Sequence, residues 1–163
     1  GFQPFYPGPG LGGHCIPLDP YYLSWKAREY GFHTSMIESS MMINDKMPEY
    51  CVDRAAKMLN RRAKKAMNGS KVLVLGVAYK QDIDDYRESP ALRVIEELEH
   101  EGAQVRQSIP QLTEQVLKEA DLVMVTTAHT NVDYEMVQKN AALVFDTKNA
   151  MKKVAERENI EVL

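Results

Sequence analysis

Short apolar runs separated by polar stretches characterise the chain from residue 71 onward. Three of them predict buried strands, because parallel strands covered on both faces are continuously apolar. They are KVLVLGVAY, LVMVTT and ALVFDT at residues 71–79, 122–127 and 142–147, and QVRQS at residues 104–108 predicts a shorter strand. Helices are predicted between them, from Ser89-Pro90 to Gly102 and from Thr113 to Ala120. Strands that alternate with helices predict an open, doubly wound parallel sheet over residues 69–163.

Helical patterns fill most of residues 1–68. Asp19-Pro20 predicts a helix start, with Asp19 as the cap, and Gly31 predicts its end. A second helical region is predicted from Thr34 to Asn68, with a kink or restart at Met47-Pro48. Its apolar stripe is either protein core or a dimer seam. The stripe comprises Val52, Ala55, Ala56 and Leu59.

Charge and cysteine content then limit the class of protein. A net charge of −3 argues against a basic nucleic-acid groove and against a polybasic membrane patch. No apolar run approaches the roughly 20 residues that cross a bilayer. The two cysteines do not suggest a disulfide framework, so we expect a reducing, cytoplasmic environment. Because the chain opens at Gly1-Phe2, without an initiating methionine, we expect a carboxyl-terminal piece of a longer protein.

A loop rich in glycine and proline, FYPGPGLGGHC at residues 5–15, ends on a cysteine. Bare main chain lets a ligand reach backbone N–H groups, and the nearby helix start and His14 favour a thiolate. Cys15 is therefore a candidate nucleophile; the alternative is a buried cysteine that only packs. The Asp19 carboxylate, predicted as a cap, can also orient a water molecule beside the thiol. Cys51 lies mid-helix and is predicted to be structural, and Cys15 and His14 lack metal-ligand spacing.

The glycine run does not have the context of a dinucleotide fingerprint. No strand precedes it, and a cysteine rather than a helix follows the last glycine. In the first predicted strand Gly76 stands alone, so the sheet lacks this fingerprint as well. The sheet is therefore predicted to hold a nucleotide without being a standard NAD domain.

Two further motifs place charged side chains just beyond predicted strands, where ligands of doubly wound sheets bind. YKQDIDDYRESP, which begins at Tyr79, offers Lys80 and Arg87 to phosphates. An ion pair of Arg87 with the aspartate at position 84 or 85 is an equal alternative. DTKNAM places Lys148 after a strand, where a lysine is otherwise simply solvated.

Together these motifs resemble one enzyme family. PGPGLGGHCIPLDPYYL, GVAYKQDIDDYRESPA and DTKNAM are similar to segments of the UDP-glucose/GDP-mannose dehydrogenase family, over nearly the whole chain. Within it, the pattern most resembles the bacterial UDP-N-acetylglucosamine (or N-acetylmannosamine) 6-dehydrogenases. The resemblance implies an α/β fold, with the catalytic cysteine loop and central dimerisation helices in residues 1–68 and a Rossmann-like UDP-binding domain in residues 69–163. It also implies a homodimer, paired through the central helices, that acts on a UDP-sugar.

The same resemblance implies a four-electron oxidation of a sugar C6 alcohol to a carboxylate, with two NAD. Cys15 is then the nucleophile that holds the aldehyde as a thiohemiacetal and the acid as a thioester, and Asp19 assists the hydrolysing water. Arg87 corresponds to the arginine that reaches the NAD phosphates. The implied substrate contacts are Tyr6, Gly10, Gly12, Lys80 and Lys148. Lys148 stands where many relatives have arginine, so bidentate geometry is lost there.

Departures from the family pattern bear on the substrate and on the extent of the chain. His14 and Leu18 favour a UDP-N-acetylhexosamine, with UDP-glucose as the alternative. The stretch after QVRQS is short for the family, so residues near Gln107-Ser108 are either missing or trimmed. The family's NAD domain lies outside this sequence, and we therefore expect the chain alone to be inactive.

Two readings from other classes compete with a dehydrogenase. A non-catalytic nucleotide-sugar-binding or dimerisation module keeps the fold without the chemistry, but it needs neither Cys15 nor Asp19. A cysteine hydrolase of the Cys-His type lacks a third group to orient its base, and it does not explain the sheet.

Overall fold

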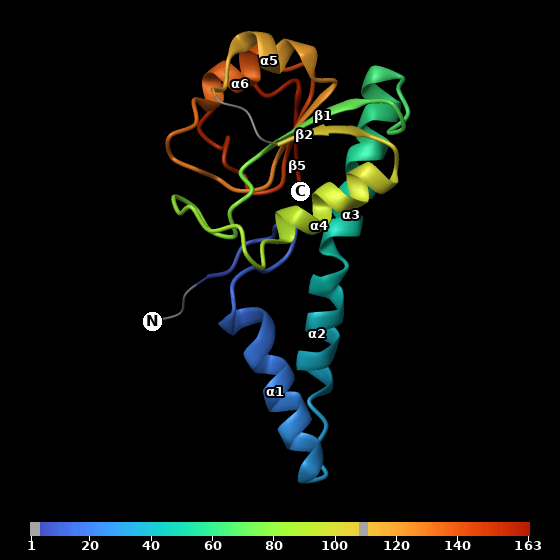
Figure 1. Cartoon of the computed structure of the whole chain (residues 1–163), viewed down its shortest axis with the longest axis vertical. Coiled ribbons are helices and arrows are strands. Elements are labelled where there is room, and N and C mark those ends of the chain that lie inside the picture. Colours follow the sequence, from blue (N-terminus) through green and yellow to red (C-terminus); the bar gives the residue numbers. More distant parts are fainter. Residues whose placement is uncertain (1–3, 108–110) are drawn as a thin grey trace.

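A parallel sheet of five strands forms the centre of the larger part of the molecule, and two helices extend from it as an arm (Figure 1). The computed structural model describes residues 4–107 and 111–163. The strand order is β2-β1-β3-β4-β5, with every neighbouring pair parallel. Their bounds are Lys71–Leu75 (β1), Gln104–Arg106 (β2), Leu122–Val125 (β3), Val144–Asp146 (β4) and Ile160–Val162 (β5). The predicted doubly wound parallel sheet is confirmed.

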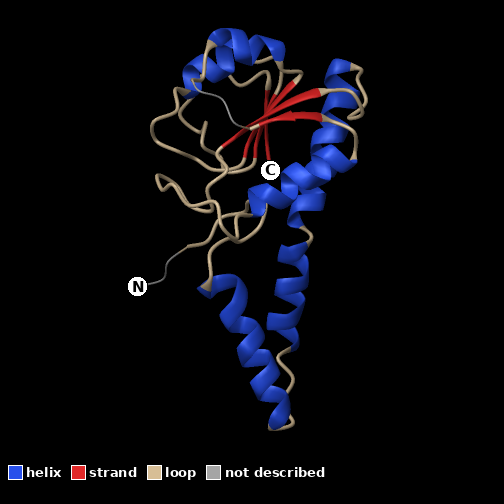
Figure 2. Cartoon of the chain, in the orientation of Figure 1, coloured by secondary structure: helices blue, strands red, loops and turns tan. Residues whose placement is uncertain are grey.

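Helices cover both faces of the sheet (Figure 2). Successive side chains of a strand point to opposite faces, so each strand contributes to two cores. On one face, Val72 and Val74 of β1 share a core cluster with residues of α3 (Met47–Met58) and α4 (Pro90–His100). On the other face, Leu73 and Leu75 share a cluster with residues of α5 (Glu114–Glu119) and α6 (Tyr134–Asn140). Because both faces are buried, the strands have the continuous apolar sequence from which they were predicted.

The helix caps of the sheet region agree with the sequence. The Ser89 hydroxyl accepts a hydrogen bond from the backbone N–H of Ala91 at 3.3 Å, and Pro90 is the first residue of α4. Thr113 caps α5 in the same way, through the N–H of Val116 at 3.4 Å. The sequence did not predict α6, which has seven residues and is capped by Asp133, or β5, which has three residues.

Two elements end well before the residue that was predicted. The helical region does not reach Asn68: a π-helical turn (Leu59–Ala63, η1) follows α3, and Lys64 ends it with a left-handed φ of 57°. The run that begins β1 does not continue to Tyr79, since Gly76 turns the chain with a φ of 88°. A β-carbon at Gly76 would lie 2.5 Å from the Thr127 carbonyl oxygen, so only glycine fits. The predicted shortening near Gln107-Ser108 falls partly on Ser108, which lies outside the described residues.

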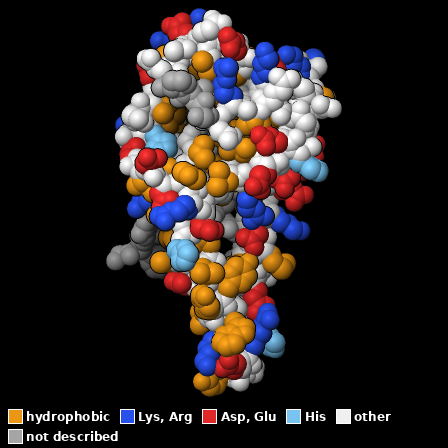
Figure 3. All heavy atoms as spheres, viewed as in Figure 1, with side chains coloured by type: hydrophobic (Ala, Val, Ile, Leu, Met, Phe, Trp, Pro, Cys, Tyr) orange, Lys and Arg blue, Asp and Glu red, His pale blue; other side chains and the backbone are white. Residues whose placement is uncertain are grey.

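The arm consists of α1 (Cys15–Glu29) and α2 (Ser35–Asp45), which contact each other. Gly31, with a φ of 69°, ends α1 as predicted, and α3 restarts at Met47 next to Pro48. Ser24 is the one buried residue of α1, and α2 has none, within the described ranges. Hydrophobic side chains therefore lie open on the arm (Figure 3). They include Ile16, Leu18, Tyr21, Tyr22, Leu23, Trp25, Met36, Met42 and Ile43.

Helix α3 belongs to the core of the sheet region. Val52, Ala55 and Leu59 of the predicted apolar stripe are buried together with β1, β3 and α4, so this stripe is core rather than a dimer seam. The division of the chain at residue 68 stays a prediction, and residues on both sides of it share this core. None of the helices formed by the described residues is both long and apolar enough to cross a membrane.

Candidate functional site

Cys15 is an exposed free cysteine at the first position of α1. The predicted helix start at Asp19-Pro20 was wrong, since α1 begins four residues earlier and Asp19 lies inside it. The reason is that Pro17 falls in the first turn, whose N–H groups have no partner within a helix, so proline costs nothing there. His14 precedes the helix, and its side chain makes no capping hydrogen bond.

This earlier start places the thiol and the carboxylate on one face of α1. Residues four apart in a helix lie above one another, so Cys15 and Asp19 are neighbours along the helix surface. Both are exposed, and Asp19 also borders a cavity of about 620 Å³ between α1 and α2. The two predicted catalytic side chains are therefore near each other on one face of α1, at its junction with the glycine loop.

The glycines before Cys15 allow the loop to pack closely on the rest of the protein. A β-carbon at Gly12 would lie 2.6 Å from the Cβ of Tyr79 and 2.8 Å from the Cδ of Pro90. The N–H of Gly13 donates a hydrogen bond to the Glu88 carbonyl at 3.3 Å. Part of the bare backbone expected to face a ligand thus faces protein instead. The same contact holds the start of α1 against the segment that carries Lys80 and Arg87.

Three predicted substrate residues line one cleft of about 510 Å³, where β3 and β4 end. They are Tyr6, Gly10 and Lys148. A β-carbon at Gly8 would lie 2.6 Å from the Nζ of Lys148, which shows that the ammonium rests on the amino-terminal loop. Partial desolvation there lowers the pKa of Lys148, although the residue as a whole is exposed.

The cleft also contains polar residues that the sequence analysis did not single out. They are Gln81, Thr147, Asn149 and Lys152. Thr147 and Asn149 fall in the strand-end segment where ligands were expected. Lys152 follows Lys148 by four residues, and this spacing in the sequence could have indicated a second cation in the cleft. Cys15 and Asp19 do not line this cleft, but Leu11 borders both it and the α1–α2 cavity.

A buried carboxylate shapes the turn that presents Lys148. Asp146, at the end of β4, is 0% exposed and accepts hydrogen bonds from three backbone N–H groups. They belong to Lys148 at 3.1 Å, Ala150 at 3.0 Å and Met151 at 2.8 Å. The turn is therefore fixed from inside the protein, and it carries a lysine to the cleft.

Lys80 and Arg87 both lie on the exposed segment between β1 and α4. Asp85 accepts hydrogen bonds from the Arg87 Nε at 3.0 Å and Nη2 at 2.8 Å, so the ion-pair alternative for Arg87 is present. These hydrogen bonds lower the pKa of Asp85 to about 2. The Arg87 side chain is 83% exposed, and a surface pair of this kind exchanges readily for another anion.

Cys51 is buried in the core, and this burial raises its pKa to about 12, which confirms the prediction of an unreactive structural cysteine. Across residues 4–107 and 111–163, no three His, Cys, Asp or Glu side chains are grouped as metal ligands.

Residues 1–46 match the central domain of the UDP-glucose/GDP-mannose dehydrogenase family, and residues 73–115 match its UDP binding domain. A UDP-N-acetyl-D-mannosamine dehydrogenase from Methanocaldococcus jannaschii is 31% identical, over 96% of this chain and 38% of the relative. A UDP-N-acetyl-D-glucosamine 6-dehydrogenase from Pseudomonas aeruginosa is 39% identical, over 64% of this chain and 24% of the relative.

Solved structures agree with these matches. A UDP-D-ManNAc dehydrogenase from Pyrococcus horikoshii superposes with a TM-score of 0.82 at 28% identity, over 97% of this chain and 40% of that chain. The UDP-N-acetyl-mannosamine dehydrogenase Cap5O from Staphylococcus aureus superposes with a TM-score of 0.71 at 32% identity, over 99% of this chain and 39% of that chain. This chain thus spans about 40% of the length of these proteins, or less. It belongs to the UDP-glucose/GDP-mannose dehydrogenase family.

Proposed function

We propose that this chain supplies the reactive thiol and the UDP-binding part of an NAD-dependent UDP-N-acetylhexosamine 6-dehydrogenase. The observation that carries the proposal is the packing of the glycine loop. This loop joins Cys15 to the segment bearing Lys80 and Arg87, and its beginning lines the cleft with Lys148. The loop that ends on Cys15 therefore packs against the segment that carries two of the cations, and it borders the cleft that contains the third.

The cations suit a nucleotide diphosphate. Lys148 is held by the Asp146 turn at the carboxyl end of the sheet, where doubly wound folds bind their ligands. Its ammonium is partly desolvated, which strengthens its attraction to a phosphate. In this proposal Lys80 contacts the same substrate, and Tyr6 with the backbone at Gly10 and Gly12 borders the sugar.

In the catalytic cycle that we propose, the C6 alcohol first loses a hydride and a proton and becomes the aldehyde on which Cys15 acts. The Cys15 thiolate adds to the C6 aldehyde carbon and gives a thiohemiacetal, whose carbonyl oxygen takes up a proton. Loss of hydride and a proton from this adduct leaves a thioester on Cys15. Asp19 then accepts a proton from water as the water oxygen attacks the thioester carbon. The C–S bond breaks, the Cys15 thiolate is regenerated, and the acid gives its remaining proton to solvent.

In this proposal Arg87 is the residue of this chain that would contact NAD. When bound, NAD would accept the hydride from C6. Arg87 presents an exposed guanidinium whose bidentate contact with Asp85 has the same geometry as a contact with phosphate. The role of Arg87 is to hold the cofactor's phosphates beside the Cys15 helix.

The choice of sugar rests on the relatives and on two residues. The relatives named above are dehydrogenases of UDP-N-acetyl-D-mannosamine and UDP-N-acetyl-D-glucosamine. His14 and Leu18 follow the pattern of that branch. We therefore propose a UDP-N-acetylhexosamine as the substrate. A clear preference for UDP-glucose, in a side-by-side comparison of kcat/KM, would overturn this choice.

We also propose that the protein pairs through the arm. The apolar side chains of α1 and α2 are exposed, whereas α3 is occupied by the core of its own sheet. The pairing surface thus leaves out α3 and includes α1, so it differs from the predicted helical region from Thr34 to Asn68. An exposed thiol at Cys15 needs a reducing environment, so we place the protein in the cytoplasm.

The proposal is tested in a protein that joins this chain to an NAD-binding domain of the family. Cys15→Ser should abolish net oxidation to the acid while UDP-sugar binding persists, because an alcohol is a far weaker nucleophile than a thiolate at neutral pH. Cys51→Ala is the matched control and should remain active, since Cys51 is buried in the core. Steady NADH production by the Cys15→Ser protein at the normal rate would exclude the covalent mechanism.

A further inference from the structure

Two loops meet at the carboxyl ends of β1 and β3. The β1–α4 loop (residues 76–89) carries Lys80 and Arg87, and the β3–α6 loop (residues 126–133) lies beside it. Two threonines join them near the strands. The Thr126 hydroxyl donates to the Gly76 carbonyl at 2.6 Å, and the Thr127 hydroxyl donates to the Ala78 carbonyl at 2.5 Å. The first residues of the β1–α4 loop are therefore fixed to β3.

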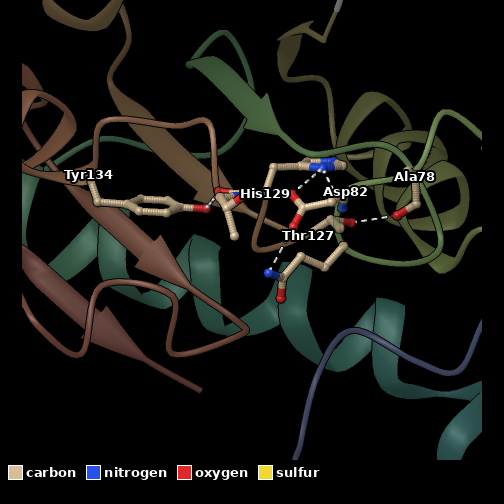
Figure 4. Close-up of polar contacts among 7 residues, drawn as sticks. Ala78, Asp82, Thr127, His129 and Tyr134 are labelled. Atoms are coloured by element: carbon tan, nitrogen blue, oxygen red, sulfur yellow. Dashed lines mark hydrogen bonds and ion pairs between the residues drawn. The ribbon is translucent and has the colours of Figure 1, made fainter.

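Further along, Asp82 repeats this connection with its backbone and its side chain (Figure 4). The N–H of Thr130 donates to Asp82 Oδ1 at 2.8 Å, and the N–H of Asp82 donates to Nδ1 of His129 at 3.1 Å. Gln81 Nε2 donates to Asp82 Oδ2 at 3.1 Å. The Thr130 hydrogen bond is the largest reason why the pKa of Asp82 is lowered.

The His129 side of this contact is itself anchored. The backbone carbonyl of His129 accepts a hydrogen bond from the Tyr134 hydroxyl at 3.1 Å, at the first position of α6. Burial raises the pKa of Tyr134 to about 12, so this hydroxyl remains a donor at neutral pH. The contact between Asp82 and His129 is thus connected, through Tyr134, to helix α6, which packs on the sheet.

The backbone of Asp82 is in an uncommon conformation. Its φ is +59°, in the left-handed region that residues with a β-carbon rarely adopt. Aspartate and asparagine tolerate this region better than most residues, because their short polar side chains can hydrogen-bond to nearby backbone. A strained conformation persists only where surrounding contacts hold it in place. Here two hydrogen bonds to the β3–α6 loop do so, one from the Asp82 N–H and one to the Asp82 carboxylate.

Lys80 lies between two fixed points. On one side the N–H of Tyr79 donates to the Asp85 carbonyl at 3.0 Å, which closes the loop on itself. On the other side is Asp82. Lys80 itself is exposed, and a free lysine side chain loses about 2 kcal/mol of rotamer entropy when a ligand orders it. A backbone that already points the lysine at its ligand avoids adding loop entropy to that cost.

We propose that Asp82, clamped by His129 and Thr130, is a positioning residue that aims Lys80 at the diphosphate of the bound nucleotide. This inference rests on the proposed function, because it takes Lys80 as a substrate contact. It adds Asp82, His129 and Thr130 to the residues that serve nucleotide binding, and it gives a reason for the left-handed aspartate.

The first test measures UDP binding to the full 163-residue chain by calorimetry. Asp82→Ala removes the acceptor and keeps the strain, and it should weaken binding about tenfold, the scale of one lost hydrogen bond to a charged group. Asp82→Asn keeps an oxygen acceptor and tolerates the same φ, so it should bind within about threefold of the natural chain. Asp82→Gly relieves the strain without restoring the acceptor and should behave like Asp82→Ala.

Asp84→Ala is the matched control. Asp84 is an exposed aspartate of the same loop and takes part in none of the contacts described above, so its loss changes the charge without opening the clamp. The Asp84→Ala chain should bind UDP like the natural chain. Equal weakening by Asp84→Ala and Asp82→Ala would overturn the inference, because charge rather than position would then explain both.

The second test is a double-mutant cycle with Lys80→Ala. If Asp82 acts through Lys80, Asp82→Ala should cause no further loss of UDP affinity in the Lys80→Ala chain. The same tenfold loss in both backgrounds would overturn the inference, as would normal binding by Asp82→Ala when Lys80→Ala binds weakly. A chain that ignores UDP, or that binds it equally well without Lys80, overturns the proposed function and this inference with it.

Discussion

Apolar residues are about as frequent in the α1–α2 arm as in the sheet region, but the sheet region buries them and the arm exposes them. In the sheet region, Val72 to Leu75 are all buried, and helices cover both faces. In the arm, Trp25 is 64% exposed and Met36 is 84% exposed. The sheet region therefore satisfies its apolar surface within this chain, whereas the arm offers its apolar surface outward. Contacts in the sheet region therefore hold the fold, whereas the apolar surface of the arm is available to another surface.

The largest effect should come from the core of the sheet region. Phe145 is 0% exposed, and Phe145→Ala should lower the free energy of unfolding by about 3–5 kcal/mol, through lost burial and the cavity left behind. Met36→Ala on the arm should change it by less than about 0.5 kcal/mol at a concentration where the chain is monomeric. Urea titration followed by circular dichroism measures both. Comparable losses in the two variants would remove the contrast between the regions.

A smaller effect is expected at the edge of the sheet region, where it borders the cleft. Asp146→Ala leaves three backbone N–H groups without their acceptor and should cost about 1–3 kcal/mol of stability. It should also weaken UDP binding, because the turn that holds Lys148 loses its anchor. Asp146→Asn, which retains one acceptor oxygen, should lose less of both. Unchanged UDP affinity in a folded Asp146→Ala chain would separate the turn from the binding site.

On the arm, the expected change is in assembly rather than in folding. Ile43 is 66% exposed on α2, and Ile43→Asp should weaken self-association at least tenfold, or about 1.4 kcal/mol, by placing a charge in an apolar contact. Sedimentation measures the association, and the monomer should remain folded. Glu49→Gln, an exposed change on α3, serves as the control. Association that survives Ile43→Asp would move the interface away from this face of α2.

The smallest effect concerns the loop between the two regions. The Asp85 pKa of about 2 lies below its ordinary value of 3.8, so the pair with Arg87 favours the folded state above about pH 4. This contribution disappears as the pH falls through 2. Arg87→Ala should return the Asp85 pKa toward 3.8, which NMR titration of the carboxyl carbon measures. A pKa that stays near 2 would assign the shift to other groups of the loop.

The parts of the fold that the sequence predicted are those set by local chemistry. The apolar runs located the three central strands, and Ser89-Pro90 located the start of α4. The start of α1 was misplaced because Asp19-Pro20 has the composition of a cap, while Pro17 permits an earlier turn. Local patterns of this kind are ambiguous when two prolines lie close together.

The sequence predicted which residues form the candidate site, but not the contacts that hold those residues in place. Tyr6, Gly10 and Lys148 do share a cleft. The contacts of Gly12 with Tyr79 and of Asp82 with Thr130 join residues far apart in the sequence, and no local pattern encodes such pairs. Asp146 was missed for a related reason, since a carboxylate that ends a buried strand looks the same whether it serves a ligand or the backbone.

The left-handed residues of the described chain have a consequence for attempts to make the protein more heat-resistant. Four residues other than glycine have a φ between 51° and 59°, namely Lys64, Asp82, Glu88 and Asn149. Lys64 ends a helix far from the cleft, so glycine there should relieve strain harmlessly. The other three lie in the loops that carry Lys80, Arg87 and Lys148. Substitutions that relax the backbone of those loops would raise heat resistance but would also disorder the residues proposed to bind the nucleotide. Stabilising substitutions should therefore be sought elsewhere in the chain.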